Sequence, residues 1–223
     1  MRALVTGGEG GIGRAVRARL EREGYEVESL DIVDGFDVSD PAAWDEVEAV
    51  DLGCLNAGVL TGTRDIRELT DEQYARALSV NVDGVVLGVR RLARVMDGGA
   101  IVVTASLAGL TAMPSDPIYS LTKHALIGFV RSVAPQLDPI RINAVCPGLA
   151  DTAMVDAQRE EIEATRFPLL APEEVAEAVW QAAQSEGTGD AWFVQPGRDP
   201  APFRFQNVPG PRAGGERVGL PPL

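Results

Sequence analysis

The chain of 223 residues is 45% hydrophobic, which predicts one compact α/β domain and leaves little room for a second core. Its formal net charge of −13 argues against nucleic acid or an anionic membrane as a partner, because like charges repel. Two cysteines and one histidine are too few for a zinc site or a disulfide framework. These counts favour a reduced, cytoplasmic setting without a bound metal. Since no apolar stretch is long enough to cross a bilayer, we also expect a soluble protein.

Short apolar runs rich in valine, isoleucine and leucine alternate with longer amphipathic stretches. This alternation is typical of βαβ units, and it predicts a doubly wound, Rossmann-type parallel sheet with helices on both faces. The expected strands are Ala3–Thr6, Glu26–Leu30, Leu52–Leu55, Ala100–Ala105, Arg141–Val145 and Ala191–Val194. The expected helices are Ile12–Glu23, Pro41–Val50, Asp71–Met96, Ile118–Gln136 and Pro172–Glu186.

Two of these helices begin with capping signals. Asp40 precedes Pro41 as an N-cap before a proline at the first helical position, and Thr70 with Gln73 makes a capping box. Residues 209–223 are rich in Gly, Pro and Arg and show no periodicity, which predicts a tail. The expected organisation is therefore one domain over residues 1–208, with the tail behind it.

A glycine-rich segment, Thr6–Gly13, lies between the first expected strand and the first expected helix. In this position glycines let the main chain approach a pyrophosphate at the helix N-terminus, and the segment therefore favours a dinucleotide. The simpler alternative is a tight strand-to-helix turn, because a glycine cluster alone is weak evidence.

Asp31 follows the second expected strand, where a carboxylate receives the adenosine ribose hydroxyls of a bound dinucleotide. Its charge would repel the 2′-phosphate of NADP, so the sequence favours NAD. Asp31 as an ordinary turn residue is the alternative. Arg14 could favour NADP, although we expect it to be solvated.

The form Thr6-Gly7-x-x-x-Gly11-x-Gly13 resembles the short-chain dehydrogenase/reductase family, and further motifs follow in the order of that family. These are Asp37-Val38, Asn56-Ala57-Gly58, Asn81-Val82-Asp83-Gly84, Ser106 with Tyr119-Ser120-Leu121-Thr122-Lys123, and Pro147-Gly148 with Thr152. The resemblance implies a nicotinamide-dependent oxidoreductase that acts on an alcohol or ketone as a homodimer or homotetramer. It implies cofactor contacts at Gly7, Gly11, Ile12, Gly13, Asp37, Val38, Asn56, Ala57, Gly58, Tyr119, Lys123, Pro147, Gly148 and Thr152.

Tyr119 is the candidate base for the hydroxyl proton of an alcohol. A free tyrosine has a pKa near 10 and needs a nearby cation to act as a base, and Lys123 four residues later lies on the same helical face. Lys123 is the only lysine among the 20 Lys and Arg residues, which indicates that an ammonium is needed here. The alternative is a surface pair on a helix without a chemical role.

Ser106 and Asn81 complete the candidate catalytic set. Ser106 ends the expected strand Ala100–Ala105, where its hydroxyl could polarise the substrate oxygen. By the family resemblance, Asn81 would bind a water that relays protons from Lys123 to solvent. Its alternative role is a hydrogen bond to a neighbouring main chain inside a helix.

The substrate is less defined. We expect a lid over about Ala153–Ala171 and an apolar pocket, which suits an apolar alcohol or ketone. The expected lining is Leu107, Met113, Pro114, Leu149, Met154 and Val155. The chain departs from its relatives at Leu55-Asn56, where most have two asparagines, and at Gln195-Pro196-Gly197-Arg198, which replaces a glycine pair.

Two other functions are compatible with parts of the sequence. A serine hydrolase would use Ser106 and His124, but the residues around Ser106 do not form a glycine-flanked nucleophile elbow. A nucleotide-binding sensor or scaffold would keep the glycine segment and lose the catalytic groups. The presence of all four catalytic residue types favours the enzyme.

Overall fold

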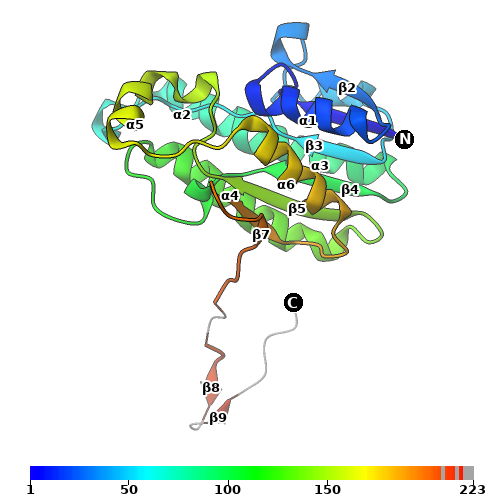
Figure 1. Cartoon of the computed structure of the whole chain (residues 1–223). Helices are drawn as coiled ribbons and strands as arrows, with labels where there is room; N and C mark the ends of the chain where they lie inside the picture. The colour runs from blue at the N-terminus through cyan, green and yellow to red at the C-terminus, as the bar shows by residue number, and fades with distance from the viewer. Residues whose placement is uncertain (207–208, 214–215, 218–223) are drawn as a thin grey trace.

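The structure is a computed structural model that describes residues 1–206, 209–213 and 216–217. Part of the expected tail, residues 209–223, therefore lies outside the described residues. Beyond the domain, Arg212–Ala213 (β8) and Glu216–Arg217 (β9) form an antiparallel pair, which Figure 1 shows away from the main body.

A seven-stranded sheet in the order β2-β1-β3-β4-β5-β6-β7 forms the centre of the domain. All neighbouring strands run parallel except β6 and β7, which are antiparallel. The strands are β1 Arg2–Thr6, β2 Glu26–Leu30, β3 Leu52–Leu55, β4 Ala100–Thr104, β5 Arg141–Pro147, β6 Ala191–Val194 and β7 Ala201–Pro202. The six expected strands are thus present, and β7 is an addition.

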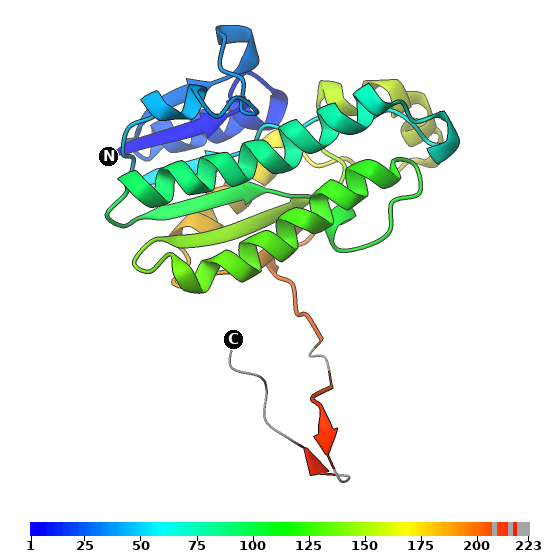
Figure 2. The same cartoon turned by 180° about the vertical axis from the view of Figure 1, so that it is seen from behind.

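Helices cover both faces of this sheet, which confirms the expected doubly wound class. Helices α1, Gly11–Arg22, and α6, Pro172–Gln184, pack together on the face seen in Figure 1. Helices α3, Gly84–Val95, and α4, Pro117–Val133, lie on the opposite face, seen in Figure 2. Alternate residues of one strand enter the two cores, as Leu4 and Val5 of β1 do.

The expected capping box starts helix α2, Asp71–Leu78. The main-chain N–H of Gln73 donates to Thr70 Oγ1 at 3.2 Å, and the main-chain N–H of Thr70 donates to Gln73 Oε1 at 3.0 Å. These reciprocal bonds satisfy two donors that a helix start otherwise leaves unpaired.

The expected helix Pro41–Val50 is wrong, because this segment contains only a 3-10 turn, Ala43–Glu46. Trp44 is buried and donates from its indole nitrogen to the carbonyl of Val38 at 2.9 Å. The carbonyl of Val47 accepts from Arg91 Nε at 2.7 Å, while the main chain of Val47 is extended. Tertiary bonds and core packing therefore replace the helical hydrogen bonds.

The expected helix Asp71–Met96 is present as one helical run, Asp71–Val95, and a π-helical turn within it, Ser79–Asp83, divides α2 from α3. The turn contains the candidate residue Asn81, whose side chain is fully buried. Gly84 follows it, and a Cβ atom there would lie 2.8 Å from Val38 Cγ2. Interrupted helical geometry of this kind is frequent at functional sites.

The region expected as a lid, residues 153–171, contains a 3-10 helix, Ala153–Gln158, and a short helix α5, Arg159–Thr165. The sequence did not predict α5.

At the other end of the domain, the chain after β7 packs back on α4, where the guanidinium of Arg131 lies 3.9 Å from the ring centroid of Phe205.

Candidate active site

The motifs meet at one edge of the sheet, at the carboxyl ends of its parallel strands. Strand β1 leads into the glycine turn, β2 into Asp31, β3 into Asn56, β4 into Ser106, and β5 ends at Pro147. Crevices at this edge bind ligands in open α/β sheets. A hollow of about 490 Å³ lies at the opposite edge, lined in part by Asp51 and Gly99, and contains none of the motif residues.

The glycine turn packs closely enough to require glycine. A Cβ atom on Gly13 would lie 2.0 Å from the carbonyl oxygen of Gly7, and one on Gly11 would lie 2.5 Å from Thr152 Cγ2. Gly7 has a φ of +63°, which strains other residues. At the start of α1, Gly10 provides no side-chain cap and the first turn carries no acidic residue. The free N–H groups of this helix start therefore fit the pyrophosphate of a dinucleotide.

Asn56 and Ala57 fasten the next loop to this turn. Thr6 Oγ1 accepts from the main-chain N–H groups of Asn56 at 2.9 Å and Ala57 at 3.1 Å. The Asn56 amide nitrogen donates to the carbonyls of Thr6 and Gly7, at 3.2 and 3.3 Å. Asn56 therefore shapes the site through the main chain of the glycine turn.

Asp31 lies beside the glycine turn, as the sequence predicted, but its carboxylate is only 7% exposed. One oxygen accepts from the main-chain N–H of Glu9 at 2.9 Å, and the other accepts from that of Val33 at 3.2 Å. Arg14, in contrast, is 67% exposed, with its Nε 3.7 Å from a Glu9 carboxylate oxygen. Asp31 is thus a buried acceptor that caps the 3-10 turn Ile32–Asp34, and its role toward a ribose remains a prediction.

Asp37 and Val38 occupy the loop after β2. Asp37 Oδ1 accepts from the main-chain N–H and the hydroxyl of Ser39, at 2.9 and 2.7 Å. Val38 is buried and its carbonyl binds Trp44. These bonds hold the loop in place near the carboxyl end of the sheet.

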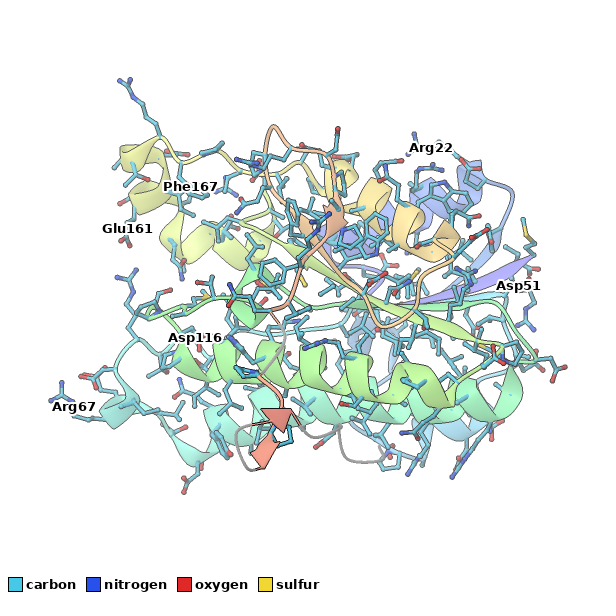
Figure 3. The ribbon with its side chains drawn as sticks, turned by 90° about the horizontal axis from the view of Figure 1, so that it is seen from below. Arg22, Asp51, Arg67, Asp116, Glu161 and Phe167 are labelled. Carbon is cyan, nitrogen blue, oxygen red and sulfur yellow. The ribbon has the colours of Figure 1, made fainter. Side chains whose placement is uncertain are left out.

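Asp116 caps helix α4 and was not identified from the sequence. Its buried carboxylate, 2% exposed, accepts from the main-chain N–H groups of Tyr119 at 2.9 Å, Thr61 at 2.8 Å and Gly62 at 3.2 Å. It also accepts from the Thr61 hydroxyl at 2.7 Å. Figure 3 shows Asp116 at one end of the helix that carries Tyr119. The pair Asp116-Pro117 is a helix-start signal that could have revealed it.

Tyr119 and Lys123 lie one turn apart on α4, and both are buried. Burial raises the pKa of Tyr119 to about 12, while a hydrogen-bond contribution from Ser106 acts in the opposite direction. Burial lowers the pKa of Lys123 to about 8. In this arrangement burial governs the Tyr119 pKa, and Lys123 is not among the groups that shift it.

The position of the Lys123 ammonium explains why it does not lower the Tyr119 pKa. Lys123 Nζ lies 5.4 Å from the ring centroid of Tyr119 and donates to the carbonyl of Thr104 at 2.8 Å. A Cβ atom on Gly58 would lie 3.4 Å from both Lys123 Nζ and Asn81 Oδ1, so these groups converge on one point. The sequence motif Asn56-Ala57-Gly58 therefore borders the candidate catalytic residues.

Ser106 lies directly beyond β4, with Pro147 of β5 beside it. Its hydroxyl donates weakly to the carbonyl of Pro147 at 3.4 Å and accepts from the N–H of Ala108 at 3.1 Å. A Cβ atom on Gly148 would lie 3.4 Å from Leu107 Cδ1, so the two loops pack against each other. Ser106 is near enough to Tyr119 to lower the pKa of its phenol, against the larger effect of burial.

Asn81 is the fourth candidate, and its side chain is fully used by protein groups. Its Oδ1 accepts from the N–H of Val59 at 2.8 Å, and its Nδ2 donates to the carbonyl of Val59 at 2.9 Å and to Thr122 Oγ1 at 3.1 Å. The bonds join the π-helical turn to the loop after β3. The role of Asn81 in a water relay remains a prediction.

His124 does not form a pair with Ser106. Its Nδ1 lies 2.9 Å from the carbonyl of Ser120 on the same helix, and its side chain is exposed. The geometry of a serine hydrolase, in which histidine bonds the nucleophile, is therefore not formed by these two residues.

The fold is that of the doubly wound, Rossmann-type α/β proteins, with the motif residues gathered at the carboxyl ends of the strands. The model of the short chain dehydrogenase family matches residues 41–163. The chain belongs to the short-chain dehydrogenase/reductase family. Among the residues described, no helix has both the length and the apolar character needed to cross a membrane.

Relatives and solved structures agree with this assignment. The chain is 33% identical to a 3-alpha-(or 20-beta)-hydroxysteroid dehydrogenase of Mycobacterium tuberculosis, over 87% of this chain and 88% of the relative. It is 37% identical to an uncharacterized NAD-dependent oxidoreductase of the same species, over 66% of this chain and 56% of the relative. The ligand-free aldohexose dehydrogenase of Thermoplasma acidophilum matches with a TM-score of 0.77 at 27% identity, covering 86% and 91% of the two chains.

Proposed function

We propose that this protein is an NAD-dependent dehydrogenase that interconverts a secondary alcohol and a ketone. The observation that carries the proposal is the convergence of Ser106, Tyr119 and Lys123 beside an uncapped, glycine-lined helix start. The glycine turn, Asp31 and the loops at Asn56 and Pro147 would hold the cofactor. NAD, when bound, accepts or supplies a hydride at its nicotinamide ring.

The residues of the chain would manage the proton. With a pKa of about 12, the Tyr119 phenol is protonated at neutral pH and suits donation to a ketone oxygen. Oxidation of an alcohol needs the phenolate, and a cation beside the ring lowers the cost of forming it. Lys123, with a pKa of about 8, remains largely protonated at pH 7, and in this proposal it supplies that cation once cofactor and substrate fill the site. Ser106 would hold the substrate oxygen by a hydrogen bond.

The substrate in this proposal is an apolar, small or medium-sized alcohol or ketone. Of the expected lining, Val155 is buried and Met154 is 42% exposed in the segment between β5 and α5. An apolar pocket would recover the hydrophobic free energy of a carbon skeleton. The name of the hydroxysteroid dehydrogenase relative supports this substrate class.

We further propose a cytoplasmic homodimer or homotetramer. Helix α4 exposes Leu121, at 47%, together with Ala125 and Gly128. These residues recur at helical spacing and would pack against a second copy.

The test is an NAD(H)-linked spectrophotometric screen across secondary alcohols, hydroxysteroids, hydroxyacyl thioesters and polyols, in both reaction directions. Turnover with apolar secondary alcohols or their ketones is expected. Sugar phosphates are added as charged substrates, and turnover with these alone would contradict the substrate class. Cofactor binding without any turnover would instead favour a sensor or scaffold.

A further inference from the structure

The adenosine end of the proposed cofactor site contains an acidic residue of the glycine turn, Glu9, that the family motif leaves undefined. Its main-chain N–H donates to Asp31 Oδ2 at 2.9 Å, so the two residues are held side by side. Its side chain is 31% exposed and points to the same end of helix α1 as two arginines, Arg14 and Arg17. Glu9 thus lies between the predicted specificity residue and these cations.

The carboxylate of Glu9 is hydrogen-bonded to Arg17 and lies within ion-pair distance of the more exposed Arg14. Arg17 Nη1 donates to Glu9 Oε1, which also accepts from the Ser29 hydroxyl at 3.0 Å. Arg14 Nε lies 3.7 Å from Glu9 Oε2. Arg17 is only 28% exposed and also donates to the carbonyl of Gly8 at 3.4 Å, so its guanidinium is held on the turn itself. Ser29 precedes Asp31 by two residues on the same side of β2.

This arrangement bears on the choice between NAD and NADP. A 2′-phosphate needs arginine or lysine donors to replace its hydration, and bidentate contacts with arginine are the strongest of these. Asp31 would repel the 2′-phosphate, and this repulsion is one way to select NAD over NADP. A second way is to leave no arginine free to bind the phosphate. Glu9 would provide this second way, since Arg14 and Arg17 already have an anionic partner.

We propose that Glu9 is a second specificity-determining residue for the coenzyme, which acts by withholding Arg14 and Arg17 from the 2′-phosphate. The inference rests on the proposed function. Glu9, Asp31, Arg14 and Arg17 have formal charges that sum to zero. Loss of either acid leaves one net positive charge, but only loss of Glu9 releases the guanidinium groups. Replacement of Asp31 alone therefore gives an incomplete change toward NADP.

Calorimetric titration with two adenosine nucleotides tests this without any turnover. The probes are AMP and adenosine 2′,5′-bisphosphate, which differ only in the 2′-phosphate, and the measured quantity is the ratio of their dissociation constants. Glu9→Gln keeps the side-chain shape and should shift this ratio at least tenfold toward the bisphosphate. Asp31→Ser, with Glu9 intact, should shift the ratio less than Glu9→Gln does. The double variant should exceed the product of the single shifts, because the released arginines bind the phosphate fully only where Asp31 no longer repels it.

Matched controls separate the mechanism from a general charge effect. Glu21→Gln removes the same charge from α1 at an exposed position and should leave the ratio unchanged. Adding Arg14→Gln and Arg17→Gln to the Glu9 variant should return the ratio to that of the unmodified protein. An unchanged ratio in Glu9→Gln, or an equal shift in Glu21→Gln, would overturn the role of Glu9. If no form of the protein binds AMP, the proposed nucleotide site fails, and Glu9 with it.

Discussion

Lys123 Nζ lies 5.4 Å from the centre of the Tyr119 ring and donates its hydrogen bond to the main chain of β4 at Thr104. The ammonium is therefore fixed beside the phenol by a strand, not by the phenol itself. Both side chains are buried, and each pKa is shifted toward the neutral form. These shifts bring the Lys123 pKa nearer to neutral pH and take the Tyr119 pKa further from it, so the phenol is held in its protonated form in this arrangement.

Tyr119→Phe removes the hydroxyl and should reduce turnover by about a hundredfold or more, because general acid–base catalysis is lost. Binding of NAD should stay nearly unchanged, since the ring and Lys123 remain. Steady-state rates and fluorescence titration with NADH measure the two effects. Tyr74→Phe on α2, a 41% exposed tyrosine, should change neither quantity. Near-normal turnover in Tyr119→Phe would eliminate Tyr119 as the proton-transfer group.

Lys123→Arg should also lose most activity although the charge is kept. The site holds a compact ammonium 2.8 Å from the Thr104 carbonyl in a fully buried position, and a planar guanidinium is larger and directs its donors differently. Initial rates at saturating cofactor measure the loss, with circular dichroism to check folding. An active Lys123→Arg variant would remove the argument that the only lysine of the chain is required here.

The buried lysine also predicts a dependence of stability on pH. Burial lowers the Lys123 pKa from 10.5 to about 8, so the unfolded chain binds more protons than the folded chain between these two values. The free energy of unfolding attributable to Lys123 therefore rises with pH across this window, and below about pH 8 the full cost of the buried charge remains. The shift corresponds to at most about 3 kcal/mol.

Lys123→Met isolates this effect, because other groups titrate in both proteins. Urea unfolding from pH 7 to pH 9.5 should show the unmodified protein gaining stability relative to Lys123→Met as pH rises. The test uses the change with pH in the difference between the two unfolding free energies. The size of that difference at one pH is not used, since Thr104 loses a hydrogen bond in the variant at every pH. A flat or falling difference would show that Lys123 is not desolvated in solution.

Sequence patterns predicted the strands well because a buried parallel sheet needs continuous apolar runs. All five residues of β4 are buried, and such a run has few other stable locations in a protein. The π-helical turn at Asn81 could not be predicted from local periodicity. It is held by bonds to Val59, which lies 22 positions earlier in the chain.

Two Asp-Pro pairs also show that a local sequence signal does not by itself determine the local structure. Asp40-Pro41 and Asp116-Pro117 give the same helix-start signal, yet the first precedes a 3-10 turn and the second a helix of 17 residues. The difference comes from Trp44, whose burial and bond to Val38 hold the first segment in a different path. In the site, sequence reasoning predicted which residues meet but not that burial governs the Tyr119 pKa.

The proposed oligomer can be tested at Leu121, the large apolar side chain of α4 that is 47% exposed. Leu121→Glu would place a charge in the proposed contact between copies, which is costly when desolvated. Light scattering should show a dimer or tetramer for the unmodified protein and a smaller species for the variant. Gln184→Glu on α6, on the other face of the sheet, adds the same charge and should keep the assembly. A stable monomer at micromolar concentration in the unmodified protein would contradict the oligomer.

Asp116 gives the sharpest test of how the site is held together. Its carboxylate accepts four hydrogen bonds, and these join the first turn of α4 at Tyr119 to the loop at Thr61 and Gly62. Asp116→Asn replaces one acceptor oxygen by an NH₂ group that faces N–H donors, so buried donors lose their partner. Unfolding free energy should fall by about 1–3 kcal/mol, and kcat should fall more than KM rises because Tyr119 is displaced.

Asp40→Asn is the matched control, because it changes the same residue type before a proline. Asp40 is exposed and its side chain accepts one hydrogen bond, from the N–H of Ala42 at 2.9 Å, so the effect on stability should stay within about 0.5 kcal/mol. Urea unfolding and steady-state kinetics on both variants make the comparison. Equal effects at the two positions, or a loss of stability in Asp116→Asn without any loss of kcat, would show that Asp116 supports the fold alone and does not position Tyr119.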